Sequence, residues 1–371
     1  MRRSRQARFE VLLTDGLVQL VRHLRRGQLR GTTPSPLERA SEPFAPAAWV
    51  AAARRAPDFA AALLRCQPPQ HEYQLLQRAL ARYHRAPHPT ALGRQRMQQL
   101  ALNLERWRWL AIPDSAYVLL NLPAYRLEVV RHGRVVHAQR LLIGAPESPT
   151  PVFSGRITGF TLAPEWVASP AEAATQLLPY LRDNKRFASE SSFLADNNYS
   201  IYDSLGRAIN PDTVDWEALS AHHFPYTIRQ APGAGNPLGY LAFELAGATG
   251  TYLYGAAGPP AFDQPARAVE AGDVRLEQPL WLAAYLLGPI DPRQATLPSE
   301  AACAALTVSQ YFRLRRPLPV HVRYATCAVV GGQVQFYPDI YGQDADLGRL
   351  LFGSRPPRLV AAGSGLPRQS R

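Results

Sequence analysis

The sequence predicts an α+β protein in which a helical region comes first and a mostly β region follows. Apolar residues recur at helical spacing over residues 9–24 and again over 71–84. Beyond residue 112, apolar and polar residues alternate, as they do in strands that bury one face. With 371 residues, the chain has material for about two domains.

The helical region is expected to occupy residues 1–112. Gly27 follows the first apolar stripe and is placed to end that helix, because glycine readily takes the backbone conformation of a helix C-terminus. Pro57 is expected to break the second helix. The expected helices cover 9–24, 47–66, 71–84 and 91–110.

The net charge of +12 belongs to this helical region. Residues 1–112 hold 19 Arg against 7 acidic residues, whereas residues 113–371 hold 22 basic and 22 acidic residues. A basic helical region can meet an anionic partner such as nucleic acid, acidic lipid or a cell-wall polymer. The alternative is a basic face that only meets solvent.

Neither an export signal nor a membrane span is visible in the sequence. The run "VLL" that follows the basic N-terminus ends at Thr14, which is too short for the apolar segment of a secretion signal. No stretch approaches the roughly 18 apolar residues of a transmembrane helix. The cysteines Cys66, Cys303 and Cys327 lack metal or redox spacing, so no metal and no cofactor is expected.

The β region is expected to open with a hairpin. Residues 117–144 alternate around His132-Gly133, a dipeptide suited to a tight turn. Further strands are predicted over 155–163, 239–246, 251–255, 320–330 and 333–342, and helices over 170–184, 276–288 and 299–312.

Several of these segments, in this order, resemble one known family. The hairpin "YVLLNLPAYRLEVVRHGRVV" is followed by "PYTIRQAPGAGNPLGYLAFEL" and then by "AVEAGDVRLEQPLWLAAYLL". They resemble the opening hairpin, the R-Q-x-P-G-x-x-N-x-L-G signature and the catalytic loop of L,D-transpeptidases, the YkuD-type enzymes that cross-link peptidoglycan. The upstream helices resemble the helical scaffold of the large Gram-negative members.

The resemblance implies a division of the chain. A basic helical scaffold would cover residues 1–112 and a YkuD-like domain 113–354, with a helical capping insertion at about 164–222. Residues 355–371 carry four arginines and no acidic residue and are expected to form a disordered basic tail. The large members usually carry a peptidoglycan-binding repeat among the scaffold helices, and this chain has no room for one.

The residues at the family's catalytic positions have changed. Family enzymes use a Cys thiolate as nucleophile and a His that assists proton transfer. Here Asp273 stands at the Cys position and Tyr254 at the His position, while Glu270 and Ala271 replace the polar residues before the conserved Gly272. A carboxylate is a poor nucleophile towards an amide, and a tyrosine is a poor base at neutral pH. The resemblance therefore predicts a catalytically inactive protein, with no catalytic residues.

What remains is a set of candidate residues for the substrate groove. They follow the family pattern at Arg229, Gln230, Gly233, Asn236, Gly272 and Arg275, with Tyr254 beside them. The family implies a role in cell-wall biogenesis and cell shape, through binding of peptidoglycan stem peptides or of an active cross-linking enzyme. It also implies a periplasmic or cell-envelope location, although without a visible signal peptide a cytoplasmic location stays open.

Two alternative functions remain open. Glu270, Asp273 and Glu277 are three carboxylates close in sequence, so an active cell-wall enzyme with rewired residues is one alternative. Nucleic-acid binding through the basic N-terminal third is the other. The absence of an aromatic-interleaved basic motif or a helix-turn-helix signature disfavours it.

Overall fold

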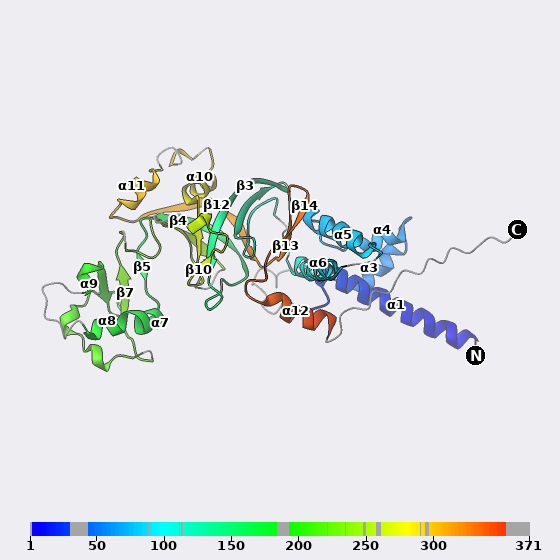
Figure 1. Cartoon of the computed structure of the whole chain (residues 1–371), viewed down its shortest axis with the longest axis horizontal. Helices are drawn as coiled ribbons and strands as arrows, with labels where there is room; N and C mark the ends of the chain where they lie inside the picture. Colours follow the sequence, from blue (N-terminus) through cyan, green and yellow to red (C-terminus); the bar gives the residue numbers. More distant parts are fainter. Residues whose placement is uncertain are drawn as a thin grey trace. The chain divides into compact units, whose positions relative to one another are not determined.

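The computed structural model divides the chain into two compact units (Figure 1). One unit contains the N-terminal helices together with residues from Ala325 onward, and the other begins at residue 113 and ends at Tyr324. The expected basic tail at 355–371 lies outside the described residues. The structure describes residues 2–29, 44–87, 90–110, 112, 114–183, 193–220, 222–233, 235–247, 250–256, 261–289, 291–293 and 297–353.

The helical unit follows the expected pattern closely. The second expected helix is broken around Pro57 into two short helices, and the helix expected at 71–84 has those bounds. The first helix ends before Gly27, whose φ of 83° suits the turn. Among the described residues, no helix is long and apolar enough to cross a membrane. The helices are α1 (Arg2–Arg26), α3 (Pro46–Ala53), α4 (Phe59–Leu64), α5 (His71–His84), α6 (Ala91–Trp109) and α12 (Gln343–Phe352).

A C-terminal hairpin completes this unit. Strands β13 (Cys327–Val330) and β14 (Gln333–Phe336) pair antiparallel, and Cys327 joins a buried cluster with residues of α5 and α6. The side chain of Gln99 donates to the carbonyls of Thr326 and Tyr337, at 2.7 and 2.9 Å. These contacts place residues 325–353 with the helices, whereas the division expected from the sequence grouped them with the β-rich domain. The remaining expected bounds stay a prediction.

The second unit is built on a nine-stranded mixed sheet, the mostly β region that the sequence predicts. Its strand order is β10-β3-β11-β9-β8-β4-β12-β1-β2, and β2 also pairs with β3, so the strands from β3 round to β2 form a closed ring. The strands are β1 (Ala116–Asn121), β2 (Arg126–Arg131), β3 (Arg134–Gly144), β4 (Phe153–Leu162), β8 (Leu241–Ala246), β9 (Leu253–Gly255), β10 (Ala268–Glu270), β11 (Val274–Leu276) and β12 (Gln310–Arg323).

The predicted opening hairpin is confirmed. Strands β2 and β3 pair antiparallel with Arg131 opposite Arg134, and the two turn residues His132 and Gly133 both have positive φ, at 48° and 73°. A two-residue turn with positive φ at both positions matches the twist of the strands that it joins. The core of the sheet is formed by fully buried side chains, among them Leu120, Leu127, Leu141, Ile143, Ile157, Phe160 and Leu162.

The expected helix at 299–312 is too long. Helix α11 covers only Glu300–Ala304, and Gln310 already belongs to β12, where it pairs with Leu162 of β4. The β-branched Thr307 and Val308 disfavour a longer helix, and the pairing with β4 stabilises the extended chain that follows. The helix expected at 276–288 is α10 (Pro279–Leu287).

A smaller layer forms the cap of this unit. It contains a three-stranded sheet in the order β5-β7-β6 and the short helices around it (Figure 1). Trp166, Ile201, Ile228 and Trp216 are buried in its hydrophobic cluster. Its elements are β5 (Trp166–Val167), β6 (Tyr199–Tyr202), β7 (Thr227–Gln230), α7 (Pro170–Glu172), a π-helical turn (Ala173–Leu177), α8 (Leu178–Asp183) and α9 (Phe193–Asp196).

Candidate functional site

The residues at the family's base and nucleophile positions lie on or directly before two neighbouring strands. Strands β9 and β11 run parallel, with Tyr254 opposite Arg275 and Leu253 opposite Val274. Asp273 directly precedes β11, and Glu270 ends β10. The fold therefore brings together Tyr254 at the family's base position, Asp273 at the nucleophile position and Glu270, which replaces a polar residue of the family motif.

The loop that carries Asp273 is held by the segment after β3. The backbone N–H of Ala145 donates to the carbonyl of Glu270 at 2.8 Å, and the Thr150 hydroxyl donates to the carbonyl of Asp273 at 3.3 Å. Gly144 permits this close packing, because a Cβ there would lie 2.3 Å from the carbonyl oxygen of Ser148 and 3.0 Å from Cα of Gly272. Gly272 itself has a φ of 92°, a conformation that favours glycine.

The Asp273 side chain is half-buried and bound to the backbone. Its Oδ1 accepts a hydrogen bond from the N–H of Tyr252 at 2.8 Å. Burial raises the pKa of Asp273 to about 6; the bond from Tyr252 lowers it, and the negative charges of Glu172 and Glu270 raise it further. At neutral pH the group is mostly a carboxylate in an unfavourable environment. Its proton equilibrium lies close enough to neutrality to respond to modest changes in pH.

Tyr254 and Glu270 bind each other. The tyrosine hydroxyl donates to Oε2 of Glu270 at 2.8 Å, and the ring is buried in the hydrophobic cluster shared with the cap. Burial raises the pKa of Tyr254 well above its ordinary value, and the charge of Glu270 and the hydrogen bond to it add to the effect. The raised pKa favours the protonated hydroxyl, which is the form that donates to Glu270.

Arg275 binds the backbone of its own site. One of its terminal nitrogens donates to the carbonyl of Ala256 at 2.7 Å, and its guanidinium lies 5.9 Å from the centre of the Phe262 ring. This arrangement holds the chain just after β9. The hydrogen bond from Arg275 to Ala256 positions the backbone next to Tyr254.

The signature loop is also organised by its own side chains. The Asn236 amide donates to the carbonyls of Pro164, Gln230 and Ala231, at 3.0 to 3.3 Å. The Gln230 amide donates to the carbonyl of Gly235 at 3.1 Å and to that of Asn197 at 3.0 Å. These two predicted groove residues thus shape the loop.

Glycines allow the signature loop to lie close to strand β9, which carries Tyr254. Gly233 accepts a backbone hydrogen bond from Asn236, which in turn accepts one from Gly239 at 2.9 Å. Gly239 forms a bridge with Gly255, and a Cβ on Gly239 would lie 2.4 Å from Cα of Ala256. The signature loop and the end of β9 are therefore in close backbone contact.

Arg229 differs from the other predicted groove residues. It lies on β7 of the cap, its guanidinium is 4.8 Å from the centre of the Tyr202 ring, and its closest carboxylate contact is 3.9 Å from Glu165. Its side chain is 42% exposed. A partly exposed arginine with a loose ion pair retains donors for an anionic ligand.

The third carboxylate of the sequence cluster has another task. Glu277 accepts hydrogen bonds from the side chain and the backbone N–H of Arg140, at 3.0 and 3.1 Å for the Nε and backbone nitrogens. The Arg140 guanidinium lowers the pKa of Glu277. Glu277 therefore forms an ion pair with Arg140, whereas Glu270 binds Tyr254 and Asp273 binds the Tyr252 backbone. In the parts of the chain that the structure describes, no group of three or more His, Cys, Asp or Glu side chains is arranged to hold a metal ion.

Several residues that shape the site were not found from the sequence. The backbone N–H of Tyr252 donates to the Asp273 side chain, and the Thr150 hydroxyl donates to the Asp273 carbonyl. Such contacts leave no sequence signal. Glu172 does have a sequence signal, because "SPAE" is the pattern of a helix capping box. Ser169 and Glu172 form both hydrogen bonds of that box. The charge of Glu172 close to Asp273 was not predictable.

The solved structures that resemble this chain include L,D-transpeptidases of low sequence identity. The enzyme from Mycobacterium smegmatis is 14% identical, covers 56% of this chain and 58% of its own, and has a TM-score of 0.23. L,D-transpeptidase 1 from Mycobacterium tuberculosis is 15% identical, covers 57% and 62%, and has a TM-score of 0.20. These values are too low to support an argument about function.

Sequence comparison is more decisive. A Haemophilus influenzae protein named "Putative L,D-transpeptidase" is 29% identical over 263 residues, which are 70% of this chain and 50% of that protein. The chain thus spans about half the length of this curated relative. Residues 1–80 match a scaffold domain, and residues 115–310 match the L,D-transpeptidase catalytic domain. Because this second match covers more than half of the chain, the protein belongs to the L,D-transpeptidase catalytic domain family.

Proposed function

We propose that this protein is a member of the L,D-transpeptidase family that no longer catalyses acyl transfer and that acts in cell-wall metabolism by binding. Its ligand would be a peptidoglycan stem peptide or an active cross-linking enzyme, and its place would be the cell envelope. The observation that carries the proposal is the arrangement of Asp273, Tyr254 and Glu270.

The nucleophile position supports this proposal. Transpeptidation in the family needs an attacking thiolate, which combines high polarisability with a pKa that can be tuned. At position 273 the side chain is a carboxylate that accepts a hydrogen bond from the Tyr252 backbone. A mixed anhydride formed by such a group would collapse before an amine acceptor could resolve it.

The base position supports the proposal independently. The Tyr254 hydroxyl keeps its proton and donates it to Glu270 in a hydrogen bond. It cannot withdraw a proton from a nucleophile or from an incoming amine. Loss of both groups of a catalytic pair typically removes several orders of magnitude in rate.

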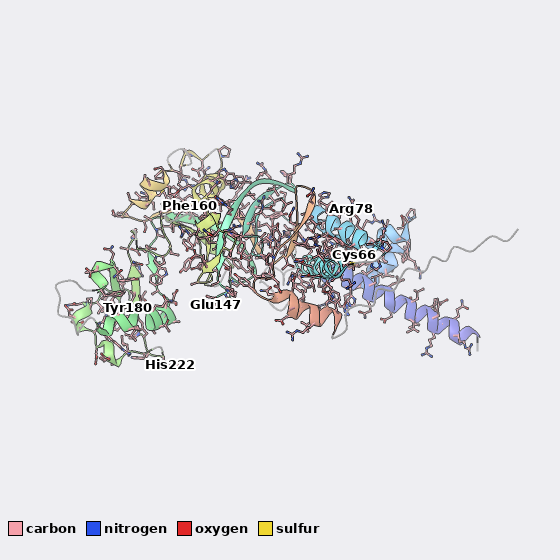
Figure 2. The ribbon with its side chains drawn as sticks, in the orientation of Figure 1. Cys66, Arg78, Glu147, Phe160, Tyr180 and His222 are labelled. Carbon is pink, nitrogen blue, oxygen red and sulfur yellow. The ribbon has the colours of Figure 1, made fainter. Side chains whose placement is uncertain are left out.

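No thiol substitutes for the lost nucleophile. Cys66 and Cys327 belong to the helical unit, and Cys66 is labelled among its helices in Figure 2. Cys303 belongs to the β-rich unit, but it is 1% exposed, contacts the carbonyl of Pro298, and has its pKa raised by burial and by the charge of Glu300. A buried, protonated thiol is a poor nucleophile.

The retained surface supports binding. Arg229 offers a partly exposed guanidinium on the cap, and arginine binds carboxylates in a bidentate manner. Stem peptides carry free carboxylates, so Arg229 is the residue that we assign to ligand contact. Arg275, Gln230 and Asn236 would then position the loop and strands around it.

Two measurements on the purified full chain test this function. Pulldown with isolated sacculi at low salt is expected to retain the protein, with affinity in the roughly micromolar to millimolar range of a few charge contacts. Incubation with purified muropeptides is expected to yield no cross-linked product. Retention should fall in Arg229→Ala.

The matched control is Arg207→Ala, because Arg207 is also an arginine of the cap. It is paired with Asp203, whose carboxylate also accepts the backbone N–H groups of Leu205 and Arg207, so the turn survives without the side chain. Equal loss of binding in both variants would indicate nonspecific charge attraction. A wild-type protein that stays in the supernatant would contradict the wall-binding function.

A second candidate function is favoured by one observation. The pKa of Asp273 near 6 is suited to general acid–base catalysis, so hydrolysis of cell-wall material by rewired residues is the alternative. It predicts muropeptide cleavage that Asp273→Asn abolishes. If cleavage is absent in the wild type, this alternative fails.

A further inference from the structure

Helix α1 presents an apolar stripe that no described part of the chain covers. Its second half is anchored, since Leu17, Val18, Val21 and Leu24 pack in a cluster with α3 and α4. Its first half is not, because every residue from 5 to 16 is exposed. Figure 1 shows this half extending beyond the neighbouring helices of its unit.

The exposed residues include large apolar side chains on one side of the helix. Phe9, Leu12 and Leu13 are 63%, 61% and 52% exposed, and Leu20 continues their line towards the anchored half. At about 100° per residue these four positions fall within one arc of roughly 100°. Burial of this stripe against another surface would remove several large apolar side chains from water, which is favourable.

The charge of the helix indicates what kind of surface fits. Helix α1 contains seven arginines and two acidic residues. Arg5 lies in line with the apolar stripe, one turn before Phe9, and Arg8 lies at the edge of the stripe, one turn before Leu12. An apolar stripe edged by arginines matches an anionic lipid surface, where the stripe enters the acyl boundary and the arginines meet the headgroups.

Charge also argues against a second copy of the chain as the occupant. Two α1 helices packed in parallel along their stripes would bring Arg5 and Arg8 of both copies together, and in either orientation both helices carry an excess of positive charge. Like charges at close range are destabilising. Duplex nucleic acid would satisfy the arginines but would leave Phe9, Leu12 and Leu13 in water.

We propose that the exposed stripe of α1 is a membrane-surface anchor that docks on anionic phospholipid, with Phe9, Leu12 and Leu13 of the first half and Leu20 beyond them towards the bilayer. The helix lies along the surface without crossing it. This inference does not depend on the proposed function of the β-rich unit. It would hold the protein at a membrane face and so limit where its other unit can act.

Vesicle cosedimentation of the full chain, with no added residues at the N-terminus, tests the proposal. The protein is expected to pellet with vesicles of mixed phosphatidylglycerol and phosphatidylcholine, less with phosphatidylcholine alone, and less as salt rises. Leu12→Gln should weaken binding roughly tenfold, and the double variant Phe9→Gln/Leu12→Gln roughly a hundredfold.

Val11→Gln is the matched control. Val11 is 68% exposed, adjacent to Leu12 in sequence, and on the opposite side of the helix. Its replacement should change binding less than about twofold. All these positions are exposed, so thermal unfolding should be unchanged and a loss of binding cannot come from misfolding.

Three results would overturn the anchor. The first is no binding to anionic vesicles at low salt, and the second is equal weakening by Val11→Gln and Leu12→Gln. The third is sedimentation velocity that shows a dimer lost in Leu12→Gln, which would assign the stripe to a second copy. Salt-sensitive binding to duplex DNA that survives Phe9→Gln/Leu12→Gln, without vesicle binding, would assign the arginines to nucleic acid instead.

Discussion

The hydroxyl of Tyr254 donates a 2.8 Å hydrogen bond to Oε2 of Glu270, and this bond joins two positions at which the chain departs from its family. The departures are therefore coupled. Tyr254 without Glu270 would bury an unpartnered hydroxyl, and Glu270 without Tyr254 would lose a donor. The hydrogen bond between Tyr254 and Glu270 gives each of these two side chains a partner inside the pocket.

Removal of this hydrogen bond should cost measurable stability. Tyr254→Phe deletes the donor and leaves a partly buried carboxylate without it, so the free energy of unfolding should fall by about 1–2 kcal/mol. Urea unfolding at pH 7.5 measures the change. Tyr311→Phe is the control, because Tyr311 donates to Glu244 at the surface and should cost less than about 0.5 kcal/mol. An equal loss of unfolding free energy in both variants would contradict a stabilising role for the hydrogen bond between Tyr254 and Glu270.

Asp273 should make stability depend on pH. Its folded pKa of about 6 lies above the ordinary value of 3.8, so the folded state holds the proton more tightly than the unfolded state. The stabilisation that the protonated Asp273 gives the folded state is complete below about pH 4 and is lost as the pH rises through 6. Asp273→Asn keeps the acceptor for Tyr252 and removes the charge. With solvent screening discounted, it should gain about 1 kcal/mol at pH 7.5.

The comparison of wild type and Asp273→Asn by urea unfolding at pH 4 and pH 7.5 checks this dependence. The gain should become small at pH 4, because the wild-type carboxyl is then protonated in the folded state and about half protonated in the unfolded state. A constant difference at both pH values, or a loss at pH 7.5, would contradict the raised pKa.

His321 should produce the opposite slope. It is buried in β12, its Nδ1 lies 2.9 Å from the Ser154 hydroxyl, and burial lowers its pKa to about 4. The unfolded state binds a proton below pH 6.5 while the folded state does not, so stability falls as pH drops from 6.5 to 4. The loss should be about 2–3 kcal/mol. His321→Asn should flatten this limb, and a variant with the wild-type slope would contradict the assignment.

A thiol alone should not restore transpeptidation. In Asp273→Cys the new group would meet the same burial and the same negative charges of Glu172 and Glu270 that raise the pKa of Asp273. The thiol would stay largely protonated, and Tyr254 provides no base. Cross-linked muropeptide should appear only in the double variant Asp273→Cys/Tyr254→His, assayed by chromatography. Full cross-linking by the single variant would refute this reasoning.

The fold was predictable where local chemistry determines it. His132-Gly133 between alternating residues indicates a tight hairpin, and the stripe on 71–84 is continuous enough to fix a helix. The end of α11 was not predictable, because the choice of strand after Ala304 depends on pairing with β4, far away in sequence.

The site was predictable only through the family pattern. That pattern aligns Tyr254 and Asp273 with base and nucleophile, whereas nothing in the sequence alone places Tyr254 opposite Arg275 on parallel strands. Thr150 and Tyr252 bind backbone or side-chain atoms of Asp273, and such bonds depend on how three loops converge. Gln230 and Asn236 likewise donate to backbone carbonyls of the signature loop, at Gly235 and at Ala231, and the sequence alone does not show these bonds.

The central claim is that the protein does not form an acyl-enzyme. Intact-mass spectrometry after incubation with a carbapenem tests it most directly, because the nucleophile of a family enzyme would open the β-lactam ring and stay bound to the product. The wild-type protein is expected to keep its unmodified mass, and Asp273→Cys/Tyr254→His provides the control in which a thiol is present with a base. A stoichiometric increase by one carbapenem in the wild type, mapped by peptide digestion to the loop around Asp273, would contradict the loss of acyl transfer.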